Sequence, residues 1–193
     1  MPYINDLQAQ KDWYNGIEFR SKLESKTAQA LDNIGIRYEY EPEGYKLTNG
    51  MWYRPDFWLP DVKQFVECKG KMTEMDSAKI CGLVHDTRFP VLVLSYDNAM
   101  WFVGGNYDIP DSLGVAVLNN DDYLFIGECN NCGKRYFYTE WGSYRCPCCN
   151  YHNGDHTLTQ IVPVISGAQL FNYGQQIAAD KPIYQEIANT FNN

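Results

Sequence analysis

The 193-residue sequence lacks any long apolar run, and its longest stretch is about the length of residues 89–94. That is far below the ~18 residues that a membrane-spanning helix needs. The first residues, MPYINDLQAQKDW, do not join a basic start to an apolar segment, so no secretory signal is visible. These absences predict a cytoplasmic chain in a reducing compartment, with no membrane partner.

Basic residues are also scarce, since 16 Lys and Arg stand against 24 Asp and Glu. The shortage is greatest in residues 91–193, which carry 4 Lys and Arg and 10 Asp and Glu. Composition therefore argues against a non-specific nucleic-acid coat, because such binding comes mostly from neutralised phosphates. Aromatic residues are plentiful (15 Tyr, 9 Phe and 5 Trp), which excludes a disordered chain. The length fits one domain, or one domain plus a small module.

Seven cysteines are present, an odd number that argues against a fully paired disulfide set. Four of them form the pairs Cys129-x-x-Cys132 and Cys146-x-x-Cys149, with 13 residues between the pairs. Four thiolates at this spacing suit tetrahedral zinc in a closed, structural site, and the segment resembles a zinc ribbon. Cys148 is the spare thiol, and replacement of Cys149 by His152 stays open.

Aromatic residues interleave with these cysteines. They are predicted to form the small core of the ribbon, with stacking on nucleic-acid bases as the alternative. The residues are Tyr136, Phe137, Tyr138, Trp141 and Tyr144.

The order of apolar patterns predicts an α/β core with a cysteine-rich module attached. Residues 1–15 are expected to be a short helix or arm. Helices are predicted over residues 17–34, ended by Gly35, and over residues 73–86. Residues 169–191 are predicted to form one or two helices, broken near Lys181 and Pro182. Strands are expected at residues 36–40, 51–59, 64–69, 91–96, 101–103, 115–118 and 123–126.

The stretch YRPDFWLPDVKQFVECKG carries the most chemistry. Side chains alternate along a strand, so Glu67 and Lys69 share one face while Cys68 points to the other. Antiparallel pairing through the turn after residue 59 would bring Asp56 beside Glu67. Two close carboxylates need a cation, and oxygen ligands, including the Cys68 backbone carbonyl, suit Mg²⁺ or Mn²⁺. Such a metal activates water against a phosphate, and Lys69 would orient or deprotonate that water or stabilise the developing charge.

A third carboxylate comes from the predicted helix at residues 17–34. With residues placed about 100° apart, Glu24 falls inside the apolar arc. A buried glutamate is costly unless it is paired or metal-bound, which favours a position against the site. The alternative is a plain ion pair with Arg20, four residues earlier.

The order Glu24, Asp56, Glu67-Cys68-Lys69 resembles the PD-(D/E)xK nuclease superfamily, especially small phage and bacterial proteins of that group. The resemblance covers residues 17–96. It implies a restriction-endonuclease-like core, a mixed central sheet flanked by helices, to which the zinc ribbon is inserted or appended with a C-terminal helix. It also implies that Asp56 and Glu67 bind the metal, that Lys69 is the catalytic lysine and that Glu24 is the helix acid.

The sequence thus predicts a Mg²⁺- or Mn²⁺-dependent endodeoxyribonuclease, a phosphodiester hydrolase acting on DNA, encoded by a phage or its bacterial host. The alternative is a zinc-ribbon binding protein on a nuclease-like scaffold, acting on a protein partner. A homodimer or a protein contact through the acidic C-terminal half is left open. The expected division is an arm at 1–15, the core at 16–126, the ribbon at 127–160 and a helical segment at 161–193.

Overall fold

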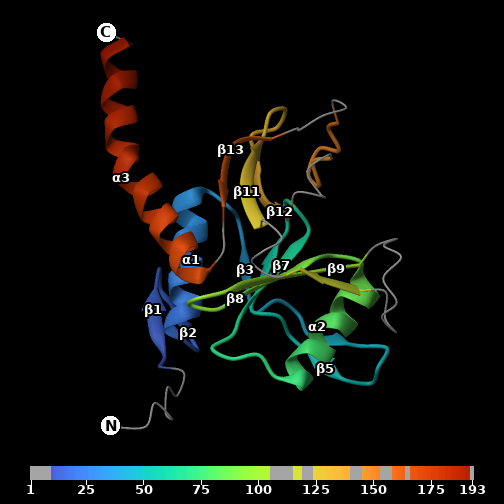
Figure 1. The fold of residues 1–193 in the computed structure, drawn as a ribbon. Helices are drawn as coiled ribbons and strands as arrows, with labels where there is room; N and C mark the ends of the chain where they lie inside the picture. The colour runs from blue at the N-terminus through green and yellow to red at the C-terminus, as the bar shows by residue number, and fades with distance from the viewer. Residues whose placement is uncertain are drawn as a thin grey trace.

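The computed structural model describes residues 10–104, 115–118, 124–139, 145–152, 158–163 and 166–191. Over these residues the chain is α/β, as predicted, with a mixed six-stranded sheet, a three-stranded antiparallel sheet and three helices (Figure 1). None of the described helices is long and apolar enough to cross a membrane.

The central sheet has the strand order β10-β9-β8-β7-β6-β3. β7 and β8 are parallel, whereas every other neighbouring pair is antiparallel. A parallel pair needs a crossover, and α2 (Glu74–Thr87) supplies it. The strands are β3 (Glu39–Tyr40), β6 (Phe57–Leu59), β7 (Gln64–Cys68), β8 (Val91–Leu94), β9 (Ala99–Gly104) and β10 (Val115–Leu118).

Two hydrophobic clusters cover the two faces of this sheet. Val66 and Cys68 pack with residues of α1 (Lys22–Ile34), whereas Phe65 packs with residues of α2. The alternation predicted for β7 is therefore confirmed. Glu67 lies between Val66 and Cys68 in sequence and so belongs to the α2 face.

The first helix begins five residues later than predicted. Ser21 is its N-cap, and the Ser21 hydroxyl accepts a hydrogen bond from the Glu24 amide at 3.2 Å. Residues 17–19 instead form β2 (Ile17–Phe19), which pairs with β1 (Asp12–Tyr14). The predicted arm is thus a strand where it is described, and residues 1–9 lie outside the described part. The helix ends at Ile34, and Gly35 adopts φ 82°, as predicted for a glycine stop.

The strand predicted over residues 51–59 is broken in two. β5 (Trp52–Tyr53) pairs with β4 (Tyr45–Lys46), and only β6 joins the central sheet. Pro55 stands at the break, where it has no N–H to offer a ladder. The break leaves Asp56 at the point where β6 enters the sheet.

The cysteine-rich part builds its own sheet from β11 (Leu124–Cys129), β12 (Arg135–Thr139) and β13 (Leu158–Pro163). β11 runs across the predicted boundary between the core, ending at residue 126, and the ribbon, starting at residue 127; the division into domains stays a prediction. The buried Gln64 side chain joins this sheet to the central one. Its amide donates to the Phe137 carbonyl at 2.7 Å and its oxygen accepts from the Phe137 N–H at 3.1 Å.

The C-terminal segment is one helix, α3 (Gly167–Phe191), and the break predicted at Pro182 is not found. An interior proline forfeits one helical hydrogen bond, which weakens a helix but does not forbid it. Its first turns pack against α1, where Gly174 lies on Ala30. A Cβ at residue 174 would come within 2.9 Å of the Ala30 Cα.

That close approach predicts that Gly174→Val lowers the free energy of unfolding by about 1–3 kcal/mol, because the added side chain must push α1 and α3 apart. Gly70→Val is the matched control, since nothing lies within 4 Å of its built Cβ. Urea denaturation of both variants measures the difference. Equal stabilities would show that α3 does not pack on α1 at this point.

Candidate active site and metal centre

Asp56 and Glu67 lie side by side where β6 and β7 begin to part, as the sequence predicted. The Asp56 backbone N–H donates to Glu67 Oε2 at 3.0 Å, and the Cys68 N–H donates to Asp56 Oδ2 at 2.8 Å. Both carboxylates are buried, with 2% and 1% of their residues exposed. The strand end therefore holds two acids of like charge, each tied to the backbone of the other strand.

Lys69 follows β7 directly and closes the site on the α2 side. Its ammonium lies 2.8 Å from Glu67 Oε1 and 3.4 Å from Asp76 Oδ1. Asp76 stands in the first turn of α2, where it also accepts from Thr73 in a capping box. Its position three residues after Thr73 identifies the cap, but its reach to Lys69 depends on how α2 sits on the sheet.

Glu24 is buried, with 5% exposed, as its place in the apolar arc predicted. It lies on the α1 face of the sheet, opposite the face that carries Glu67. Its carboxylate accepts from the Tyr40 hydroxyl at 2.5 Å and from the Ser21 hydroxyl at 3.0 Å. The alternative ion pair with Arg20 is also present, at 3.8 Å. Helix capping and a position near Asp56 are thus both features of Glu24.

The electrostatics of Asp56 reflect its burial. Loss of solvent, then the nearby Glu67 carboxylate, raise its pKa from 3.8 to about 8. Arg20 opposes this with an ion pair to Oδ1 at 2.5 Å, but its guanidinium is half exposed and therefore screened by water. Burial would lower the pKa of Lys69, but the neighbouring Glu67 outweighs it and the pKa is raised. Lys69 is consequently a cation in the metal-free protein.

Ion pairs join five carboxylates to three cations around this strand end, a formal surplus of two negative charges. Glu41 and Arg54 lie outside the strands, and Asp76 lies in the first turn of α2, so no periodic pattern in the sequence predicts that they join this group. The acids are Glu24, Glu41, Asp56, Glu67 and Asp76, and the cations are Arg20, Arg54 and Lys69.

The donor set fits a hard divalent cation. Buried carboxylates with a negative surplus are ligands that Mg²⁺ and Mn²⁺ accept. The β6–β7 register pairs Phe57 with Val66; continued by two residues, it sets Pro55 opposite Cys68. Proline has no N–H, so the Cys68 carbonyl receives no ladder bond from that position. Asp56, Glu67 and this carbonyl are the oxygens that could hold the metal.

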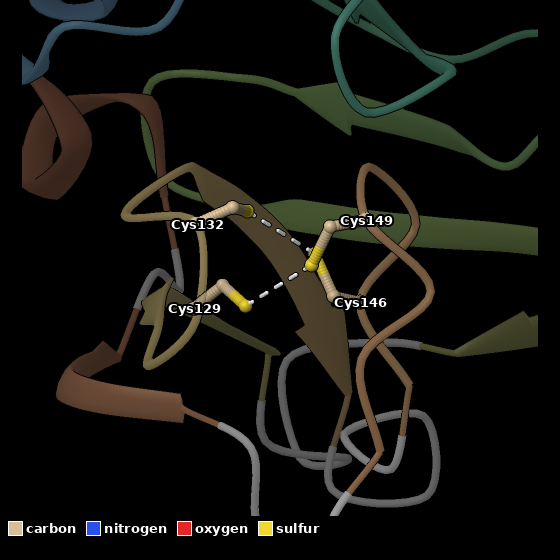
Figure 2. Close-up of side chains that lie close together, drawn as sticks. All are labelled: Cys129, Cys132, Cys146 and Cys149. Carbon is tan, nitrogen blue, oxygen red and sulfur yellow. Dashed lines mark hydrogen bonds between the residues drawn. The ribbon is translucent and has the colours of Figure 1, made fainter.

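The four cysteines predicted to bind zinc do meet (Figure 2). Cys129 Sγ lies 3.8 Å from Cys149 Sγ, and Cys132 Sγ lies 3.7 Å from Cys146 Sγ. A tetrahedron with Zn–S bonds of ~2.3 Å has edges of ~3.8 Å, whereas a disulfide needs ~2.05 Å. Among the described residues, these cysteines are the one group of three or more His, Cys, Asp or Glu whose donor atoms all lie within 4.8 Å.

The two halves of the cysteine cluster have the same backbone design. In each, the residue four places after the first cysteine has a positive φ and donates to that cysteine's carbonyl at 2.9 Å. These residues are Gly133 (φ 67°) and Asn150 (φ 61°). The Asn131 amide group and N–H also point at the sulfurs of Cys149 and Cys129, at 3.5 and 3.4 Å. Such contacts orient thiolate ligands.

The remaining candidates near the cluster are separate from it. Cys148 is exposed, as expected for a spare thiol, and His152 is not in the group, so Cys149 supplies the fourth sulfur. Tyr136, Phe137 and Tyr138 are buried, which favours the core role over stacking on bases. Trp141 and Tyr144 lie outside the described residues.

Comparison with the profiles of known protein families, with curated proteins and with solved structures found no match.

Cys132→Ser should lower the melting temperature by about 10 °C or more, because a structural zinc site contributes folding energy. Cys148→Ser is the matched control and should change it by no more than about 2 °C. Thermal unfolding and elemental analysis measure both, with one zinc per chain expected in the wild type. A folded protein without zinc would contradict the assignment.

Asp56→Asn should stabilise the protein in buffer free of Mg²⁺ and Mn²⁺, and the gain should grow as the pH rises. Asp56 has a folded pKa above its unfolded value, so its contribution to stability is present below about pH 4 and is lost by about pH 8. Asparagine mimics the protonated acid and escapes that loss. Denaturation at several pH values measures the trend.

Asp61→Asn provides a control of opposite sign. A hydrogen bond from Lys134 lowers the pKa of the exposed Asp61, so its ionised form supports the fold. Its removal should be neutral or destabilising above about pH 4. A destabilised Asp56→Asn variant at pH 8 would show that Arg20 outweighs burial and Glu67.

Proposed function

We propose that this chain is a Mg²⁺- or Mn²⁺-dependent endonuclease that hydrolyses phosphodiester bonds in DNA, with a site of the PD-(D/E)xK type. One observation carries the proposal. Asp56, Glu67 and Lys69 meet where β6 begins and β7 ends, within a group of five acids and three cations. A structural cluster would have no need of two adjacent buried acids, because burying like charges is destabilising.

Each residue has a role in this proposal. Asp56, Glu67 and the Cys68 carbonyl hold the divalent ion, which when bound activates water and offsets charge on the phosphate. Lys69 stays cationic through its pairing with Glu67, so it stabilises the negative charge that develops on the phosphate oxygens. This favours the electrostatic role of Lys69 over the role of a base. Glu24, on the opposite face, positions Arg20 and Tyr40 beside Asp56.

Zinc at the four cysteines has a structural role in this proposal. The four cysteines of the cluster would fill all four positions of a tetrahedral zinc ion, so no position is left for a water or a substrate. The alternative function, a ribbon that binds a protein partner on a nuclease-like scaffold, draws support from the ion pairs that already neutralise most of the acids. Cleavage assays separate the two functions.

Glu67→Gln and Lys69→Ala should each lower the rate of metal-dependent plasmid nicking by at least about 100-fold. Each change removes a metal ligand or the charge that stabilises the transition state. The matched controls are Glu18→Gln and Lys11→Ala, which break an exposed ion pair on the β1–β2 hairpin. They should nick at the wild-type rate. Full activity in folded Glu67→Gln would refute the site, and an inert wild type would favour the binding protein.

A further inference from the structure

Arg20 occupies the place beside Asp56 where a divalent ion would bind. Its Nη2 lies 2.5 Å from Asp56 Oδ1, and its Nε lies 2.9 Å from Glu41 Oε1 and 3.8 Å from Glu24 Oε2. One guanidinium thus pairs with three carboxylates, which come from α1, from the loop after β3 and from the residue before β6. The side chain is nevertheless 54% exposed, so it can turn outward without opening the core.

A second arginine stands beside it on the same anchor. Arg54 Nη2 lies 3.0 Å from Glu41 Oε2, so Glu41 holds one arginine on each oxygen. Arg54 is also 52% exposed. The ion pairs with Glu41 therefore hold the guanidinium groups of both arginines near the proposed metal site. Guanidinium groups arranged in this way suit the planar, paired contacts that phosphate oxygens offer.

A guanidinium and a divalent ion at Asp56 repel one another. At ~5 Å a divalent and a monovalent cation repel one another by roughly 1.7 kcal/mol even in water, which corresponds to a more than tenfold change in affinity. A bound ion thus favours the conformers in which Arg20 leaves Asp56. The phosphate that approaches the same ion then offers Arg20 a new anionic partner.

We propose that Arg20 alternates between Asp56 in the metal-free protein and a substrate phosphate in the metal-bound protein, and that Arg20 and Arg54 on Glu41 form the phosphate-binding subsite. The proposal rests on the function above. It assigns Arg20 opposite effects on two ligands: it weakens binding of the metal and strengthens binding of the nucleic acid. A purely structural arginine would support both or neither.

The first arm of the test measures Mn²⁺ binding to the zinc-loaded full chain by calorimetry, with no nucleic acid present. Arg20→Ala should bind Mn²⁺ about tenfold more tightly than the wild type, since the competing cation is gone. Arg20→Lys keeps the charge and should stay within about threefold of the wild type. Arg37→Ala is the control, because Arg37 is also more than half exposed and pairs with a different carboxylate, that of Asp61.

The second arm measures binding of a labelled duplex oligodeoxynucleotide in Ca²⁺ by fluorescence anisotropy. Arg20→Ala and Arg54→Ala should each weaken binding by about tenfold, while Arg37→Ala should not. The slope of affinity against salt should also fall by about one unit for each lost arginine.

The outcomes separate the two proposals. Unchanged or weaker Mn²⁺ binding in folded Arg20→Ala would overturn the alternation, as would unchanged binding of the oligodeoxynucleotide. Loss of both affinities would mark Arg20 as structural and would equally overturn it. If the wild type does not bind Mn²⁺, or if Glu67→Gln binds Mn²⁺ as tightly as the wild type does, the metal site itself is wrong. The proposed function then fails with it.

Discussion

The burial of two like-charged carboxylates at the end of β7 constrains everything around it. Asp56 and Glu67 are almost fully buried. Backbone N–H groups donate hydrogen bonds to them, and Lys69 and Arg20 form ion pairs with them. Each of these partners comes from a different element. The relative placement of α1, β6, β7 and α2 is therefore tied to the electrostatic needs of a few oxygen atoms.

The break at Pro55 makes this arrangement possible. A continuous strand from residue 51 to residue 59 would extend the ladder past Cys68 and satisfy its carbonyl with a backbone N–H. The proline ends the ladder instead, turns β5 away to pair with β4, and leaves Asp56 free to bond the Cys68 amide through its side chain. One missing donor thus separates a plain hairpin from a site with inward-facing oxygens.

Local patterns predicted most of the elements and the pairs of residues that meet. Alternation in β7 placed Glu67 and Lys69 together, and the spacing of the cysteines gave the cluster directly, because both signals lie within a few residues. The start of α1 was missed because Ile17 fits the apolar arc, while the Ser21 cap, which decides the boundary, is a single side chain. Glu41, Arg54 and Asp76 were not predicted as part of the site, because their ion pairs depend on tertiary packing and leave no periodic pattern in the sequence.

β7 joins the cysteine-rich sheet to the proposed carboxylate site through its two ends. Gln64, at the start of β7, forms hydrogen bonds with Phe137 of the ribbon. Lys69 follows the other end of β7, about 15 Å from Gln64 for five residues of strand. A chelator such as EDTA, commonly used to inactivate magnesium enzymes, would remove zinc from the four thiolates as well as the divalent ion proposed for the carboxylates. Loss of activity in a chelator would therefore not reveal which ion the chemistry uses. In this protein that question is answered by restoring zinc first and the second ion afterwards.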